Sequence, residues 1–378
     1  MSDAAPDNSS RPAAPADPGD VAALAALRAK IDDIDTRVVR LLSERGEAAR
    51  AIGEIKNRSG APVYSPDRER QVLDRIRAMN AGPFPDDVLL AIYRELMSGS
   101  LALERMPRVA FLGPPGSYSH VAARAKFGHA VELEPVAAIR AAFLEVERGH
   151  ADFAIVPVEN SLSGGVVDTL DALLDTPARV CAEHFQPIHH NLLSRVPLAE
   201  ISQICSKPEV FEQCRAWLAQ TGLSMKTVAV ASSSRAAELA ATEPGTAAIG
   251  SALAAELYGV PIQFRNIEDD PQNMTRFFVV GRSAAKRTGD DRTAIRFDTA
   301  HQAGALVEVL DAFRRASVNL TALSSRPSRG APWQYRFYVE AQGHAEDAAV
   351  AAAIAAAKEH CSQLVVVGSF PRAASVAE

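Results

Sequence analysis

The sequence is poor in cysteine and in long apolar runs, and each shortage excludes a class of protein. Its 378 residues include four cysteines, and none stands in a C-x-x-C pair or at a metal-like spacing from histidine. This excludes a disulfide scaffold and a common zinc site, and favours reduced cytoplasmic thiols. No apolar run is long enough to cross a membrane, and the N-terminus lacks the basic-then-apolar order of a secretory signal. We therefore expect a cytoplasmic protein with no metal and no membrane partner.

The chain also lacks an excess of positive charge. Its formal net charge is −6 and its pI is about 5.9, so we expect no nucleic-acid partner. The length leaves room for two or three domains. Residues 1–19 hold four prolines among alanine, aspartate and serine, a composition that predicts a disordered tail.

Residues 20–106 predict a region made of helices. From Leu24 to Ile55, apolar residues recur three and four positions apart, which is typical of a long helix with one buried face. A second helix should begin at Ser65-Pro66, with a serine cap and proline in the first turn, and a third should run from about Asp86 to Arg105. Long cations near the apolar face, with hydroxyl and acidic groups on the other helices, predict a pocket for a small dianion. The residues concerned are Arg28, Arg45, Lys56, Ser65, Arg68, Glu69, Ser100 and Glu104.

Beyond residue 107, strand-like runs alternate with helical runs, which predicts α/β layers. Chain order favours two lobes, residues 108–186 with a return segment at 264–282, and residues 188–262. Polar side chains stand where predicted strands end and helices begin, and such helix ends bind carboxylates, so we expect one cleft between the lobes. No G-x-G-x-x-G loop occurs, which excludes a common dinucleotide site. The polar residues are Ser117, Glu159, Asn160, Ser161, Ser206 and Ser232, and Ser206 also fits a capping box with Glu209.

The last region, residues 292–371, predicts the order strand, helix, strand, strand, helix, strand. Thr293 to Phe297 and Gln363 to Gly368 are its first and last strands, and Asn319 to Leu323 and Trp333 to Glu340 are the two strands between them in the chain. An alanine-rich stretch at about 346–359 is its second helix. This order is typical of a ferredoxin-like α+β fold.

Three sets of motifs resemble known families. The spacing from Arg28 to Glu104 resembles the all-helical chorismate mutases over residues 20–106. Residues 107–285 resemble prephenate dehydratase in three motifs, Gly113 to Ser119, Pro157 to Ser161, and the triplet Thr275-Arg276-Phe277.

Residues 292–371 resemble an ACT regulatory domain of the type fused to these dehydratases. Gly304-Ala305-Leu306 matches one of its motifs, and Ser324-Ser325-Arg326-Pro327 matches another except that Ser324 replaces the usual acid. The resemblance implies that phenylalanine binds between domains of two chains and inhibits the enzyme. The implied binding residues are Gly304, Ala305, Leu306, Asn319, Leu320, Ser325 and Arg326.

The resemblances together imply a bifunctional enzyme without a cofactor, which converts chorismate to prephenate and prephenate to phenylpyruvate. In the mutase they imply that Arg28 and Arg45 clamp the two carboxylates, that Lys56 and Glu104 face the ether oxygen, and that Glu69 binds the ring hydroxyl. Arg68 and Ser100 would complete that pocket, whereas Ser65 could simply cap its helix.

For the dehydratase, the resemblance implies that Thr275 is the catalytic residue and that Arg276 binds a substrate carboxylate. Phe277 completes the triplet, and Glu159 is a candidate proton source.

The spacing of two arginines predicts a site shared between chains. Arg28 and Arg45 are 17 residues apart, which is about 25 Å along a helix, too far for one small ligand to touch both. Arg28 should therefore serve the site of a partner chain in a homodimer or larger homo-oligomer.

Two alternatives stay open at this point. One is a mutase fused to an arogenate dehydratase, which would differ only in accepting an amine in place of the keto group. The other is a two-lobed amino-acid-sensing protein without catalysis.

Overall fold

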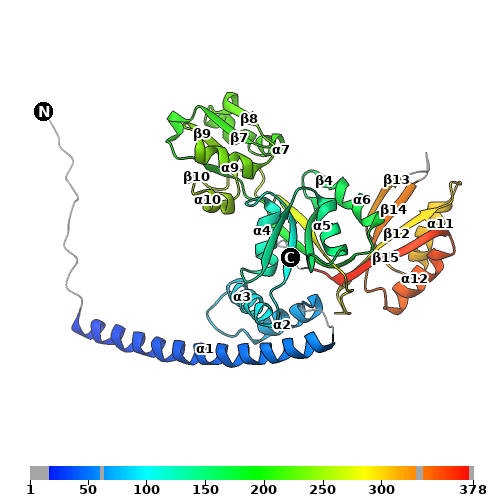
Figure 1. Cartoon of the computed structure of the whole chain (residues 1–378), viewed down its shortest axis with the longest axis horizontal. Coiled ribbons are helices and arrows are strands. Elements are labelled where there is room, and N and C mark those ends of the chain that lie inside the picture. Colours follow the sequence, from blue (N-terminus) through cyan, green and yellow to red (C-terminus); the bar gives the residue numbers. More distant parts are fainter. Residues whose placement is uncertain (1–16, 60–63, 329–334, 374–378) are drawn as a thin grey trace.

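The computed structural model describes residues 17–59, 64–328 and 335–373 (Figure 1). The tail expected over residues 1–19 lies outside these ranges except for its last three residues, and Pro18 already begins the first helix. Trp333, expected to begin a strand, also lies outside them. Within the described ranges, no helix combines the length and apolar character that crossing a bilayer requires.

The N-terminal region is helical, as its apolar spacing predicts. Its described helices are α1 (Pro18–Ser59), α2 (Pro66–Met79) and α3 (Asp86–Glu104). Helices α1 and α3 approach closely at Gly53, where a Cβ atom would lie 2.7 Å from the Cα of Glu104. The glycine therefore allows the two helices to bring Lys56 and Glu104 together.

The apolar stripe of α1 is not buried within the described chain, so that prediction was wrong for a single protomer. Leu27 and Ile31 keep 57% and 56% of their surface exposed. In Figure 1 the N-terminal half of α1 extends away from the other elements. An apolar helix face of this length is typical of an interface rather than a solvated surface.

The two-lobed α/β arrangement predicted for the middle of the chain is confirmed. The first lobe has a sheet in the order β2-β1-β3-β11-β5, with β4 paired to β3. Strand β11 belongs to the return segment, and it lies antiparallel between β3 and β5. The elements of this lobe are β1 (Arg108–Leu112), α4 (Tyr118–Phe127), β2 (Glu132–Val136), α5 (Ile139–Glu147), β3 (Phe153–Asn160), β4 (Gly164–Gly165), α6 (Val167–Asp175), β5 (Arg179–Pro187) and β11 (Met274–Gly281).

The second lobe has a sheet in the order β10-β6-β9-β7-β8. Its elements are β6 (Asn191–Leu193), η1 (Leu198–Glu200), β7 (Gln203–Ser206), α7 (Pro208–Gln213), α8 (Arg215–Gln220), η2 (Ser224–Lys226), β8 (Thr227–Ala229), α9 (Ser233–Thr242), β9 (Thr246–Gly250), α10 (Ala252–Tyr258) and β10 (Ile262–Phe264). The loop at Gly116 of the first lobe packs against this lobe, because Ser251 Oγ donates to Gly116 O at 2.7 Å.

The C-terminal region follows the predicted β-α-β-β-α-β order. Its elements are β12 (Asp291–Thr299), α11 (Ala305–Arg315), β13 (Leu320–Pro327), β14 (Tyr335–Gln342), α12 (Ala348–Lys358) and β15 (Cys361–Pro371). The strands form one antiparallel sheet in the order β13-β14-β12-β15. This is a ferredoxin-like arrangement.

The sheet of the first lobe is the centre of the molecule, because both neighbouring regions pack on it. One face forms a core with α5, α6 and residues such as Tyr338 and Phe370 of the C-terminal region. The other face forms a core with α4 and with Tyr64 of the N-terminal region. Gly368 permits close packing of β15 on β5, since a Cβ atom there would overlap the backbone of Val180.

Two candidate active sites

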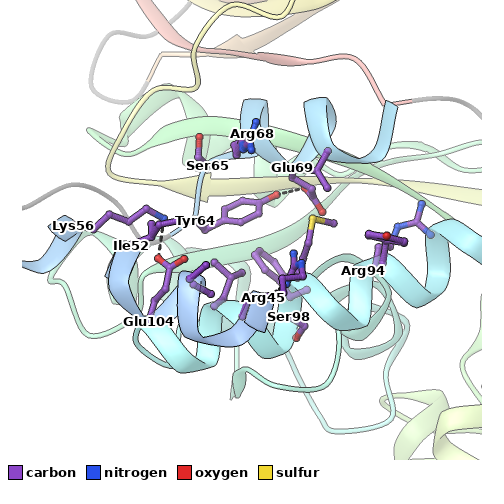
Figure 2. Close-up of a pocket in the computed structure, with 18 of the residues that line it drawn as sticks. Arg45, Ile52, Lys56, Tyr64, Ser65, Arg68, Glu69, Arg94, Ser98 and Glu104 are labelled. Carbon is purple, nitrogen blue, oxygen red and sulfur yellow. Dashed lines mark hydrogen bonds and ion pairs between the residues drawn. The ribbon is translucent and has the colours of Figure 1, made fainter. Parts of the chain in front are cut away.

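A cavity of about 460 Å³ lies among α1, α2, α3 and the end of α4 (Figure 2). This volume is in the range of small-molecule sites. Seven of the eight residues predicted for the dianion pocket line it, namely Arg45, Lys56, Ser65, Arg68, Glu69, Ser100 and Glu104. The sequence prediction therefore groups these side chains correctly.

Two polar pairs connect α1 with α3 across this cavity. Lys56 Nζ donates to Glu104 Oε2 at 2.8 Å, and the Glu104 side chain is nearly buried. Arg45 donates to the hydroxyl of Ser100 and to Leu96 O, the latter at 3.3 Å. Figure 2 shows the Lys56–Glu104 pair at one end of the cavity and Arg45 nearer the middle. Cations are thus held at two points of a half-closed space, as binding a dianion requires.

On α2, the carboxylate of Glu69 is held by two short hydrogen bonds. Its Oε2 atom accepts hydrogen bonds from Tyr64 OH and from Lys126 Nζ, both at 2.6 Å. Ser65 occupies the N-cap position without a capping hydrogen bond, and its Oγ donates to Asp67 Oδ1 instead. Ser65 is therefore not the side-chain cap that the sequence suggested.

Arg28 lies outside this cavity. It is on the same continuous helix as Arg45 and Lys56, in the half of α1 that extends from the molecule. The geometry supports the premise that one chain cannot bring all three cations to one ligand, and the shared site remains a prediction.

In the two-lobed region, Thr275 lies at the start of β11 beside the end of β3. Its Oγ1 accepts a hydrogen bond from Asn160 Nδ2 at 2.9 Å. Asn160 Oδ1 in turn accepts from the backbone N–H groups of Leu162 and Ser163, which fixes the orientation of the amide. Ser161 Oγ accepts from Met274 N at 3.0 Å. The predicted residues Asn160, Ser161 and Thr275 therefore form one cluster.

A chain of hydrogen bonds continues from this cluster into the second lobe. Asn160 Nδ2 also donates to Asn273 Oδ1 at 2.9 Å, and Asn273 Nδ2 donates to Gln213 Oε1 at 3.3 Å. Gln213 Oε1 also bonds His190 Nε2 at 2.7 Å, and His190 Nδ1 bonds Tyr118 OH at 2.6 Å.

The protonation of this chain follows from burial. Burial lowers the pKa of His190 and raises the pKa of Tyr118 well above its ordinary value. Neutral His190 then donates from Nε2 to Gln213 and accepts at Nδ1 from Tyr118. The side chains of this hydrogen-bonded chain are thus neutral, and the chain joins both lobes.

The other predicted serines form hydrogen bonds with the backbone that stabilise the fold. Ser117 caps α4 and Ser232 caps α9, each accepting a hydrogen bond from a backbone N–H. Ser206 is fully buried and donates to Ile249 O at 2.8 Å, while Lys207 takes the N-cap position of α7. The capping box predicted at Ser206 is therefore wrong. Glu159 is exposed on β3.

The carboxylate-binding role expected of Arg276 is not supported by its position. Neighbouring residues on a strand point to opposite faces, so Arg276 points away from Thr275. Its side chain is 8% exposed, and its guanidinium is paired with Glu183 and bidentately with Glu340 of β14, at 2.5 to 3.0 Å. Phe277 is buried in the core between the sheet of the first lobe and α4, and is not a ligand-binding residue in this structure.

The predicted regulator-binding residues lie at two places in the C-terminal region. Gly304, Ala305 and Leu306 begin α11, and Gly304 has a φ of +87°, which favours glycine. Asn319, Leu320, Ser325 and Arg326 lie just before or on the edge strand β13. Leu306 and Leu320 pack against the same apolar core, and Arg326 Nε donates to Asp171 Oδ1 of α6 at 2.6 Å.

Comparison with known proteins agrees with a division of the chain into an N-terminal helical region and a two-lobed α/β region. Residues 27–105 match the chorismate mutase type II family, and residues 109–285 match the prephenate dehydratase family. A bifunctional chorismate mutase/prephenate dehydratase of Aquifex aeolicus is 39% identical over 349 residues, which cover 91% of this chain and 96% of the relative. The chain belongs to the family of bifunctional chorismate mutase/prephenate dehydratases.

Two solved structures share the fold of a large part of this chain. The prephenate dehydratase of Arthrobacter aurescens, solved in complex with L-Phe, is 32% identical with a TM-score of 0.66, covering 70% of this chain and 90% of its own. A protein described as a quorum-quenching acylase is 31% identical with a TM-score of 0.65, covering 70% and 98%. Since one fold supports different activities, the sites of this chain, rather than its fold alone, determine its activity.

Several polar residues of both sites were not predicted from the sequence. Tyr64 and Lys126 contact Glu69 from positions with no helical spacing to it, and Lys126 belongs to another region of the chain. Gln213 and His190 join the Thr275 network from the second lobe and the lobe connection. Only Tyr118 carried a signal, as it stands within the Gly113–Ser119 motif.

Proposed function

We propose that this chain isomerises chorismate to prephenate in the helical cavity and converts prephenate to phenylpyruvate, water and CO2 between the two lobes. The observation that supports the first activity best is the convergence of Arg45, Lys56, Ser100 and Glu104 in one cavity. The second is supported by Thr275, whose hydroxyl is held by Asn160.

The mutase reaction is a [3,3] rearrangement, in which the ether C–O bond breaks while a C–C bond forms. It needs no covalent catalysis, so the residues act by holding the dianion compactly and stabilising charge on the ether oxygen. Arg45 binds a carboxylate of chorismate, and Lys56 with Glu104 faces the ether oxygen. Glu69 accepts a hydrogen bond from the ring hydroxyl, while Arg68 and Ser100 complete the pocket.

For the dehydratase reaction, the ring hydroxyl of prephenate leaves as water after it gains a proton. The ring carboxylate leaves as CO2, and the electrons of its C–C bond complete the aromatic ring. Because Asn160 Nδ2 donates to Thr275 Oγ1, the proton of Thr275 is left to bond the departing hydroxyl. A lone threonine hydroxyl is a weak acid, so Thr275 relays or orients the proton, with exposed Glu159 as the candidate source.

The C-terminal region acts as an ACT domain that binds phenylalanine and lowers dehydratase activity. Support comes from its β-α-β-β-α-β fold and from the left-handed Gly304 that precedes α11, since a helix N-terminus is a place where a carboxylate can bind. A prephenate dehydratase related to this chain was solved with L-Phe bound. Calorimetry that detects no phenylalanine binding, with unchanged activity at millimolar phenylalanine, would reject this role.

The chain acts as a homodimer or a larger homo-oligomer, in which Arg28 of one chain completes the mutase site of its partner. Support comes from the exposed apolar face of α1 and from the place of Arg28 outside its own cavity.

The direct test of the proposed function is a coupled assay in which the purified chain is supplied with chorismate alone. We expect prephenate to appear first and phenylpyruvate to follow without any added cofactor. A chain that binds these compounds without turnover would be a sensing protein instead. Turnover of arogenate and prephenate side by side distinguishes the remaining alternative.

A further inference from the structure

The mutase cavity is not built from the N-terminal helices alone, because α4 of the first lobe also lines it. Lys126 and Phe127, the last residues of that helix, are among the cavity's lining residues. The Lys126 ammonium lies 2.6 Å from Glu69 Oε2, and the two side chains are only 15% and 12% exposed. A short and largely buried ion pair therefore connects the dehydratase region to a residue of the mutase pocket.

Both donors to Glu69 bind the same oxygen atom. Tyr64 OH and Lys126 Nζ each lie 2.6 Å from Oε2. Oε1 accepts no hydrogen bond from the described residues, and the carboxylate belongs to the cavity wall. Held in this way from one side, Glu69 keeps its second oxygen available as an acceptor for a ligand in the cavity.

The first lobe also fixes Tyr64. Its ring packs against Phe127 and Phe153 with centroid distances of 5.4 and 5.2 Å, and the Lys126 ammonium lies 5.9 Å from its centre. Burial, followed by the nearby Glu69 carboxylate, raises the pKa of Tyr64 well above its ordinary value, so the phenol stays a donor. The orientation of Glu69 thus depends on the first lobe at both contacts.

We propose that Lys126 is a positioning residue of the mutase site, which holds Glu69 Oε2 so that Oε1 accepts a hydrogen bond from the ring hydroxyl of chorismate. This rests on the mutase activity proposed above and adds to it a residue from outside the helical region. Full mutase affinity then requires the first lobe to be docked against α2. An ion pair that merely joined the two regions would leave chorismate binding unchanged as long as the fold persisted.

The kinetic signature follows from the role of Glu69 as a binding group. The ring hydroxyl is not a reacting atom, so loosening its acceptor weakens substrate and transition state alike. In the full-length chain, Lys126→Met should raise the KM for chorismate about 10-fold, the scale of one charged hydrogen bond, with kcat within about twofold. Lys126→Arg keeps the cation and should recover most of the loss.

The experiment is a double-mutant cycle between Lys126→Met and Glu69→Gln, with dehydratase turnover of prephenate as the check on folding. If Lys126 acts through Glu69, Lys126→Met should change KM little in the Glu69→Gln background. Arg124→Met is the matched control, because Arg124 lies on the same helix but pairs with Glu256 of the second lobe. It should leave the mutase KM unchanged.

Two results would overturn the proposal: a wild-type mutase KM in Lys126→Met, or the same rise in KM in both backgrounds. If Lys126→Met fails to fold, Lys126→Gln takes its place in the same cycle. Absence of mutase activity in the unaltered chain would instead reject the proposed function itself, so the two failures are distinguishable.

Discussion

The two candidate sites of this chain differ in how they are assembled. The mutase cavity uses charged side chains on helices, draws Lys126 from another region, and leaves Arg28 outside. The dehydratase cluster uses neutral amide, hydroxyl and imidazole groups near strand ends and at the connection between lobes. Because Arg28 lies outside its own cavity, we propose that the first site needs a partner chain, whereas the second has its polar network within one chain.

This difference suits the two reactions. A rearrangement of a flexible dianion is helped by fixed cations around the ligand, which helices from separate regions and chains can supply. An elimination that moves a proton needs donors and acceptors of defined orientation, and the Thr275–Asn160–Asn273–Gln213 chain supplies that orientation. Perturbations should therefore separate the two activities.

We expect Thr275→Ala to produce the largest difference between dehydratase and mutase activity. It should lower dehydratase kcat roughly 10²–10⁴-fold, the range for loss of a positioned proton-transfer partner, and leave mutase activity near normal. Thr275→Ser should recover part of the loss, since it restores the hydroxyl. Steady-state kinetics of both reactions on the same preparations provide the measurement, and equal damage to both would indicate misfolding instead.

A charge on the apolar face of α1 should lower mutase activity and spare dehydratase activity, the reverse of the effect of Thr275→Ala. Ile31→Glu places a carboxylate on a face that we propose to be an interface, so mutase activity should fall by at least about 10-fold while dehydratase activity persists. Sedimentation and both activities, measured over a dilution series, test this. Met225→Glu is the control, because Met225 is 95% exposed in the second lobe. Normal mutase activity in an Ile31→Glu monomer would contradict the shared site.

A moderate effect is expected at the buried contact between β11 and the C-terminal region. Glu340→Gln keeps a hydrogen-bonding group but removes one carboxylate from Arg276, which should cost about 1–3 kcal/mol of stability. Dehydratase kcat should fall several-fold because Thr275 precedes Arg276 on β11, and the mutase should be spared. Thermal unfolding measures the change in stability, and steady-state kinetics measure both activities. A loss of mutase activity as large as the loss of dehydratase activity would show that the contact does not act on the dehydratase site alone.

The smallest effect concerns His184 of β5, which lies near Lys126. Burial, assisted by Lys126, lowers the pKa of His184 to about 4 from its ordinary 6.5. Below pH 6.5 the unfolded chain gains a proton that the folded chain refuses, so stability should fall as pH drops towards 4. This contribution is roughly 1–3 kcal/mol. Denaturant unfolding of the protein and of His184→Gln across this range tests it, and parallel curves would show that His184 does not contribute.

The sequence predicted the fold well because each region has its own local pattern. The three-four spacing of α1 and the strand-helix alternation from β12 to β15 are properties of neighbouring residues. The spacing of α1 could not tell whether its apolar face is covered by the same chain or by another, and in one chain it is exposed.

The sites were predicted in part. Arg45, Lys56 and Glu104 share a cavity as expected, but Lys126 could not be foreseen, because its contact with Glu69 arises from packing between regions. The resemblance assigned Arg276 to a substrate carboxylate, but strand alternation sends adjacent side chains to opposite faces, and Arg276 pairs with Glu183 and Glu340 instead.

Mixing inactive chains tests whether the mutase site is shared between chains while the dehydratase site is not. Arg28→Ala and Lys56→Ala should each abolish most mutase activity and spare dehydratase activity. After unfolding and refolding together, mixed dimers should contain one site with both residues intact. We expect recovery of about a quarter of wild-type mutase activity in an equal mixture, because half of the dimers are mixed and each has one intact site. A mixture no more active than its parents, with dehydratase activity and dimer formation intact, would contradict it.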